Sequence, residues 1–123
     1  MILFLDDCPH RIPIFLRFFP HAVVTSSAKT MIRLLTNLNQ PIEYLFLDHD
    51  LQGDANFVEG VVEDTGMEVV QWLENNRPNI KQVVVHSHNG IASPQMHERL
   101  VKANYWTVAC PFYMMIPQFE ARK

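Results

Sequence analysis

Short apolar runs alternate with helix-like patterns along the chain, and this alternation limits the fold more than any other feature. The runs that predict strands are Ile2–Leu5, Ala22–Thr25, Tyr44–Leu47, Gln82–Val85 and Thr107–Ala109. Between them apolar residues recur at helical spacing, most regularly at Met31, Leu34, Leu35 and Leu38. Strands that alternate with helices favour a parallel sheet covered by helices on both faces. We therefore predict one α/β domain over residues 1–123.

Local sequence marks several boundaries between these elements. Because proline lacks an N–H, Pro13 is expected either to kink the first helix or to begin it. Thr25–Ser27 supplies a cap for the second helix. Ser93 followed by Pro94 predicts the start of the fourth helix, with the serine as its cap. The polar stretch Gln52–Asp64 predicts a loop beside the ends of the strands, and we consider it as a lid that selects substrate.

Composition and charge narrow the class of protein. Of the 123 residues, 48% are hydrophobic and 19% are charged, which is an ordinary globular mixture. The chain has no apolar run of about 18 residues and no basic start before a cleavage site, so we expect neither a transmembrane helix nor a signal peptide. Two cysteines, Cys8 and Cys110, do not make a disulfide framework, and we expect a cytoplasmic protein. A net charge of −3 argues against a general nucleic-acid coating, which needs a basic face.

Acidic residues and histidines follow three of the predicted strands. Parallel strands that are joined by right-handed crossovers bring their carboxyl ends to one edge of the sheet, where ligands bind in folds of this kind. We therefore expect four carboxylates and three histidines to meet in one crevice. These polar segments are Asp6-Asp7, Asp48-His49-Asp50 and His86-Ser87-His88-Asn89.

The residue types in this crevice suit phosphoryl chemistry. Carboxylate oxygens are the ligands that Mg²⁺ prefers, together with waters and substrate phosphate. Imidazoles exchange protons near neutral pH, so histidines can serve a water or a departing oxygen. The hydroxyl of Ser87 can donate a hydrogen bond to a phosphoryl oxygen. A bound metal can supply the positive charge that an anionic ligand needs.

The same positions resemble those of response-regulator receiver domains. The shared features are the acidic pair after the first strand, the aspartate that closes the third, D-T-G at the third helix, a serine after the fourth strand and P-F after the fifth. By this resemblance Asp6 and Asp7 match the metal-binding acidic pair. Asp48 matches the phospho-acceptor aspartate, and Ser87 matches the hydroxyl residue. Receivers carry a lysine where this chain has Cys110, which makes a phospho-accepting receiver the weakest alternative.

Three motifs resemble a narrower family, the cyclic-phosphate processing receiver-like domains. They are L-D-D at Leu5–Asp7, L-D-H-D at Leu47–Asp50 and H-S at His86–Ser87. The resemblance implies a flavodoxin-like three-layer α/β/α fold with a five-stranded parallel sheet in the order 2-1-3-4-5. It also implies hydrolysis or binding of a cyclic phosphate on a nucleotide or an RNA end.

On these grounds we expect a phosphoesterase that acts on a cyclic phosphate. Asp6 and Asp48 are expected to hold Mg²⁺ or Mn²⁺, and a transition metal bound by His49 and His86 is an alternative. One of these two histidines would deprotonate the attacking water, and the other would protonate the departing ribose oxygen. Further expected metal ligands are Asp7 and Asp50. Expected substrate-binding residues are Ser87, His88 and Asn89.

A different class of function fits the same residues. A non-catalytic module would bind a nucleotide or a metal in the crevice and act through a partner, without turnover. In either case the expected ligand is a small nucleotide or an RNA end that carries a cyclic phosphate. We expect no membrane partner, and the sequence leaves the oligomeric state open.

Overall fold

The fold is a five-stranded parallel sheet with helices on both faces. The computed structural model describes residues 1–51 and 65–121. In chain order the elements are β1 (Ile2–Leu5), α1 (Arg11–Phe18), β2 (Val23–Thr25), α2 (Ala28–Asn37), β3 (Ile42–Leu47), α3 (Gly66–Asn76), β4 (Ile80–Val85), α4 (Ala92–Lys102), β5 (Thr107–Ala109) and α5 (Phe112–Ala121). The strands pair in the order β2-β1-β3-β4-β5, and every pair is parallel. The predicted flavodoxin-like, receiver-like fold is confirmed.

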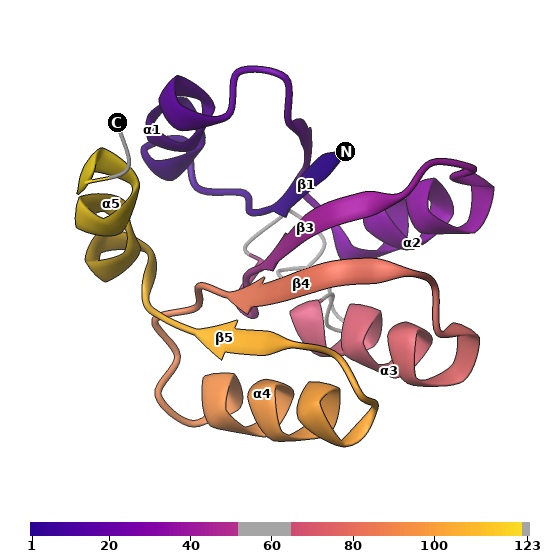
Figure 1. The fold of residues 1–123 in the computed structure, drawn as a ribbon. Coiled ribbons are helices and arrows are strands. Elements are labelled where there is room, and N and C mark those ends of the chain that lie inside the picture. Colours follow the sequence, from indigo (N-terminus) through magenta and orange to yellow (C-terminus); the bar gives the residue numbers. More distant parts are fainter. Residues whose placement is uncertain (52–64, 122–123) are drawn as a thin grey trace, which may run out of the picture.

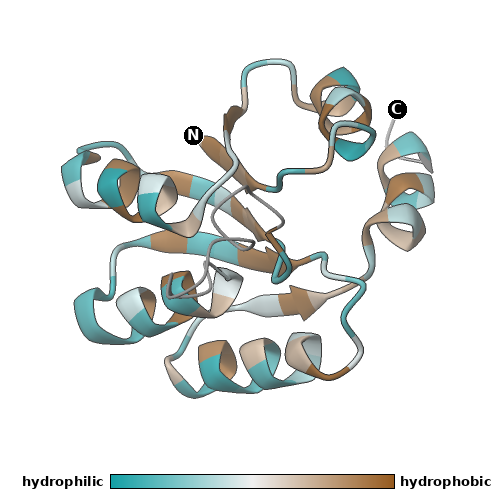
Figure 2. Ribbon diagram, turned by 180° about the vertical axis from the view of Figure 1, so that it is seen from behind, coloured by the Kyte–Doolittle hydropathy of each residue, from teal (hydrophilic) through white to brown (hydrophobic). Residues whose placement is uncertain are grey.

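The alternation of side chains along each strand divides the core into two halves. Figure 1 shows α1 and α5 on one side of the sheet and α2, α3 and α4 on the other. Leu3 and Leu5 of β1 pack into the half that α2, α3 and α4 cover. Phe4 points the other way and packs with Phe15 of α1 and Phe112 of α5. Figure 2 shows hydrophobic residues along the strands and mixed hydrophobic and hydrophilic residues along the helices.

Two of the expected helix starts differ in outcome. The cap of α2 is confirmed, since the Ser27 side chain accepts a hydrogen bond from the backbone N–H of Thr30 at 3.1 Å. The start of α1 is Arg11, two residues before Pro13. Pro13 therefore lies in the first turn, where a backbone N–H would have no helical partner, and the helix accommodates it there.

The expected cap of α4 is wrong. The helix begins at Ala92, so Ser93 lies inside it rather than before it. The cap is the side chain of Asn89, whose Oδ1 accepts hydrogen bonds from the N–H groups of Ile91 at 3.0 Å and Ala92 at 2.9 Å. The side chain of Asn89 folds back onto the backbone that follows it and accepts hydrogen bonds from two N–H groups there. Asn89 therefore takes the capping role that the sequence predicts for Ser93.

Two strands begin earlier than their apolar runs indicated. β3 and β4 start at Ile42 and Ile80, each of which is buried and is followed by an exposed charged residue, Glu43 and Lys81. Those charges interrupt an apolar run without interrupting a strand, because neighbouring side chains point to opposite faces. The predicted loop Gln52–Asp64 lies outside the described residues. In the described ranges, none of the helices is long and apolar enough to span a membrane.

Gly66 allows α3 to begin directly against the end of β3. A Cβ atom at this position would lie 1.8 Å from the backbone oxygen of Asp48. The N–H of Gly66 also donates to the backbone oxygen of His49 at 3.0 Å. The segment that carries Asp48 and His49 is thus held against the first turn of α3 by a contact that only glycine permits.

We expect Gly66→Ala to destabilise the fold and Gly90→Ala to leave it nearly unchanged. The added methyl group at position 66 forces backbone to move, at a cost of about 1–3 kcal/mol in the free energy of unfolding. At Gly90 no described atom lies within 4 Å of the place that a methyl group would take, so a change within about 0.5 kcal/mol is expected. Urea denaturation of both variants measures the difference, and equal stabilities would contradict the close approach.

Candidate functional site

Three buried polar residues follow the central strands in register. Backbone hydrogen bonds from Asp48 to Leu5 and from His86 to Leu47 extend the sheet by one residue beyond each strand. Asp6 and His86 are fully buried, and Asp48 is 3% exposed. Because each comes two residues after an aromatic or apolar residue that faces α1 and α5, all three side chains lie on that side of the sheet. One ligand atom from each lies within 4.8 Å of the others.

Arg11 joins the two buried carboxylates. Its Nε donates to Asp6 Oδ2 at 2.8 Å, and its Nη2 donates both to Asp6 Oδ1 at 3.0 Å and to Asp48 Oδ2 at 3.1 Å. The sequence analysis missed this residue. The position of Arg11 at the start of a helix could have indicated its role. A cation in the first turn interacts unfavourably with the helix dipole unless an anion lies nearby.

Asp6 is held as an anion by four hydrogen bonds. Besides the two from Arg11, it accepts one from the backbone N–H of Cys8 at 2.9 Å and one from His86 Nε2 at 3.0 Å. Burial alone would raise the pKa of Asp6, but the hydrogen bonds from His86 and Arg11 hold it well below its ordinary value. An ionised carboxylate only accepts, so His86 carries its proton on Nε2.

The pKa of Asp48 is shifted in the opposite direction from that of Asp6. Burial raises the pKa of its carboxyl group, and the neighbouring charge of Asp6 raises it further, while His86 and Arg11 only partly offset these effects. Its Oδ1 accepts a hydrogen bond from the backbone N–H of His49 at 2.9 Å. One guanidinium therefore does not fully compensate two buried carboxylates.

His86 lies in an aromatic slot beneath the site. Its ring stacks on Phe4 with centroids 4.8 Å apart, and Phe112 lies edge-on at 6.0 Å. Its Nδ1 is buried and has no hydrogen-bond partner among the described residues. His86, one of the two predicted catalytic histidines, thus lies beside Asp6 but away from solvent.

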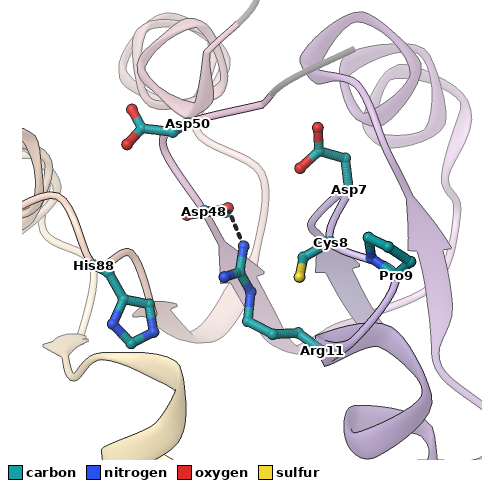
Figure 3. A pocket seen from close by; sticks show the side chains of 7 residues that line it. All are labelled: Asp7, Cys8, Pro9, Arg11, Asp48, Asp50 and His88. Atoms are coloured by element: carbon teal, nitrogen blue, oxygen red, sulfur yellow. Dashed lines mark hydrogen bonds and ion pairs between the residues drawn. The ribbon is translucent and has the colours of Figure 1, made fainter.

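A pocket of about 380 Å³ opens above the buried cluster. Its lining residues are Asp7, Cys8, Pro9, Arg11, Asp48, Asp50 and His88. Figure 3 shows the Arg11 side chain reaching from α1 toward Asp48, with Asp7, Asp50 and His88 around it. Three carboxylates and one guanidinium face this space, so an anion would need further positive charge to bind here.

His49 is oriented by its neighbour. Its Nδ1 pairs with Asp50 Oδ1 at 2.6 Å, and this hydrogen bond lowers the pKa of Asp50. Asn89 supports the pair by donating from Nδ2 to Asp50 Oδ1 at 3.2 Å. With Nδ1 committed to Asp50, Nε2 is the ring nitrogen left for proton transfer.

The three residues predicted to bind substrate lie in different places. His88 lines the pocket, and its ring lies 5.6 Å from that of Tyr113. Ser87 is 2% exposed, and its Oγ accepts a hydrogen bond from the backbone N–H of Asn89 at 3.0 Å. Asn89 uses its side chain to cap α4 and to hold Asp50. Ser87 and Asn89 thus shape the loop after β4, while His88 faces the pocket.

The buried cluster has the donor chemistry of a divalent-cation site. The two carboxylates stand close enough to share one ion, and the His86 ring beside them donates from Nε2 to Asp6. Arg11 now holds oxygens of both carboxylates. The residues present therefore fit a divalent cation once Arg11 has moved aside.

Comparison with protein-family models gave a match over most of the chain. A family model described as "Cyclic-phosphate processing Receiver domain" matches residues 1–102, from β1 to the end of α4. The comparisons with curated proteins and with solved structures gave no match.

The opposite pKa directions of Asp6 and Asp48 predict opposite effects of removing each charge. A raised pKa means that stability falls as pH rises and Asp48 ionises, so we expect Asp48→Asn to raise the free energy of unfolding at pH 7 by about 0.5–2 kcal/mol. A lowered pKa means that the charge of Asp6 stabilises the fold above the unfolded-state pKa of about 3.9, and that this stabilisation is lost as pH falls. We expect Asp6→Asn to lower the free energy of unfolding by about 3–5 kcal/mol. Urea denaturation in the presence of a chelator measures both, and equal losses in the two variants would contradict the assignment.

Proposed function

The chain belongs to the cyclic-phosphate processing receiver domain family, and from this membership and its pocket we propose that it hydrolyses a cyclic phosphate on a nucleotide or an RNA end. The observation that carries the proposal is the His49–Asp50 pair beside a pocket that also holds Arg11 and His88. A volume of about 380 Å³ lies in the range of small-ligand pockets.

Binding of the phosphate requires more positive charge than Arg11 provides. A divalent cation held by oxygens of Asp6 and Asp48 would supply Lewis-acid stabilisation of the charge that grows on the phosphate. Asp7 and Asp50 line the same pocket, where they can accept hydrogen bonds from the waters that such a cation retains. Arg11 contributes a planar set of donors that matches phosphate oxygens.

Two histidines at the pocket perform the proton transfers. One removes a proton from the attacking water as a new P–O bond forms. The other gives a proton to the ribose oxygen as the P–O bond of the ring breaks, which leaves a phosphate monoester when the ring is on a mononucleotide. We assign these transfers to His88, which lines the pocket, and to His49, whose Nδ1 is bonded to the pocket residue Asp50.

His86 receives a different role from the one the sequence indicated. It is fully buried and bonded to Asp6, and it does not line the pocket. We assign it to the positioning of Asp6, and through Asp6 of Arg11. This leaves proton transfer to the histidines nearer the surface.

Phosphorus NMR tests the proposal with a panel of cyclic phosphates. The panel contains a 2′,3′-cyclic mononucleotide, a 3′,5′-cyclic mononucleotide and a cyclic dinucleotide, each with Mg²⁺, with Mn²⁺ and with a chelator. We expect a phosphate monoester to form from at least one mononucleotide. His49→Ala and His88→Ala should each slow its formation by about 10²–10⁴-fold, the usual contribution of a general acid or base.

The matched control is His21→Ala. His21 is exposed and precedes β2, so it lies at the opposite edge of the sheet and its replacement should leave the rate unchanged. Full activity of His88→Ala would contradict the second proton-transfer role. Line broadening of a cyclic phosphate without any product would replace the hydrolase with the binding module.

A further inference from the structure

We propose that Arg11 and a divalent cation are alternative occupants of the Asp6–Asp48 pair, and that the cation releases Arg11 to bind a phosphate group in the pocket. The exchange makes cation and phosphate bind cooperatively. It rests on the proposed function only for the kind of anion, because the competition itself follows from the contacts of Arg11.

The competition follows from where one nitrogen lies. Nη2 of Arg11 is 3.0 Å from Asp6 Oδ1 and 3.1 Å from Asp48 Oδ2. A divalent cation shared by these carboxylates would bind each at about 2.0–2.6 Å, and thus in the space that this nitrogen occupies. Charge repulsion between the guanidinium and the ion adds to the overlap.

The hydrogen-bonding capacity of Asp6 also prevents Arg11 and a cation from binding it together in the present arrangement. Asp6 already accepts four hydrogen bonds, two of them from Arg11, and a carboxylate offers about four lone-pair sites. A cation can bind Asp6 only where Arg11 gives up at least one of these sites. The bonds from Cys8 and His86 do not involve Arg11, so they keep Asp6 in place during the exchange.

The charge balance favours the exchange when an anion arrives. Asp6, Asp7, Asp48 and Asp50 surround a single guanidinium in the part of the chain described here. A divalent cation added to the pair, with Arg11 retained in the pocket, would neutralise most of this charge. A phosphate would then meet two cations in place of one cation already paired with two carboxylates.

Arg11 is able to make the movement. Its side chain is 18% exposed, in contrast to the buried carboxylates, and it already lines the pocket. The guanidinium ends a long, flexible stem that begins at the first residue of α1. It can therefore turn into the pocket without any change in the helix itself.

Manganese binding measured by electron paramagnetic resonance tests the competition. The apparent affinity of the wild-type protein for Mn²⁺ is the intrinsic affinity multiplied by the fraction of molecules in which Arg11 has left the carboxylates, so we expect Arg11→Met to bind Mn²⁺ at least about tenfold more tightly. Arg17→Met is the matched control, since Arg17 is exposed in the last turn of the same helix, and its affinity should equal that of the wild type. Unchanged or weaker binding by Arg11→Met would overturn the competition.

Inorganic phosphate tests the release of Arg11. In the wild-type protein we expect phosphate to tighten Mn²⁺ binding, and Mn²⁺ to tighten phosphate binding by the same factor, in the range of about 5–150-fold. Arg11→Met should lose this coupling and Arg17→Met should keep it. Equal coupling in all three proteins would overturn the role of Arg11 in binding phosphate.

The wild-type protein provides a measurement that does not depend on how the variants fold. The Nε–H signal of Arg11 in a nitrogen–proton NMR spectrum reports its bond to Asp6, and we expect Mg²⁺ to shift it and to speed its exchange with water. An unmoved Nε–H signal at saturating Mg²⁺ would overturn the exchange. All of these readouts measure binding, so an inactive protein that shows the exchange would contradict only the proposed hydrolysis.

Discussion

The buried carboxylate of Asp6 is the constraint on which the site depends. An ion without access to solvent is stable in a protein only when it is paired and fully hydrogen-bonded. Asp6 meets this condition through groups from three parts of the chain: the backbone of Cys8, the guanidinium of Arg11 and the imidazole of His86. The need to satisfy one carboxylate therefore fixes the first turn of α1 and the end of β4 relative to β1.

The aromatic packing beneath this cluster makes its electrostatics strong. Phe4 and Phe15 stack with ring centroids 3.9 Å apart, and Phe4 also stacks on His86. Rings in contact with the polar cluster exclude water from its lower side. Charges next to such a layer interact more strongly than they would in water. A change in the charge or position of one group in the cluster therefore changes the energies of the others. The aromatic core is for this reason part of the site as well as part of the fold.

The meeting of polar residues at one edge of the sheet could be predicted from the alternation of strands and helices along the chain, whereas the strand order was implied by the resemblance to the receiver-like family. Strand alternation also predicts which of the two residues after β1 is buried. Asp6 shares a strand face with Phe4, so it points under α1, while the next residue, Asp7, lines the pocket. Alternation alone would place His86 and His88 on the same face, and they differ in burial because the chain leaves the strand before His88. Where a strand ends is the information that local sequence gives least well.

Arg11 could not be placed in the same way, because its role depends on the start of α1 and on the reach of a long side chain. Four aspartates that follow strands at one edge of the sheet indicate a metal as a source of positive charge. The fold supplies one guanidinium to the two most buried of them and still leaves Asp48 with a raised pKa. A guanidinium that compensates only part of the charge keeps the carboxylates ordered without removing their attraction for a second cation. On our proposal, the incomplete neutralisation of Asp48 is what leaves the buried pair of carboxylates able to take a divalent cation.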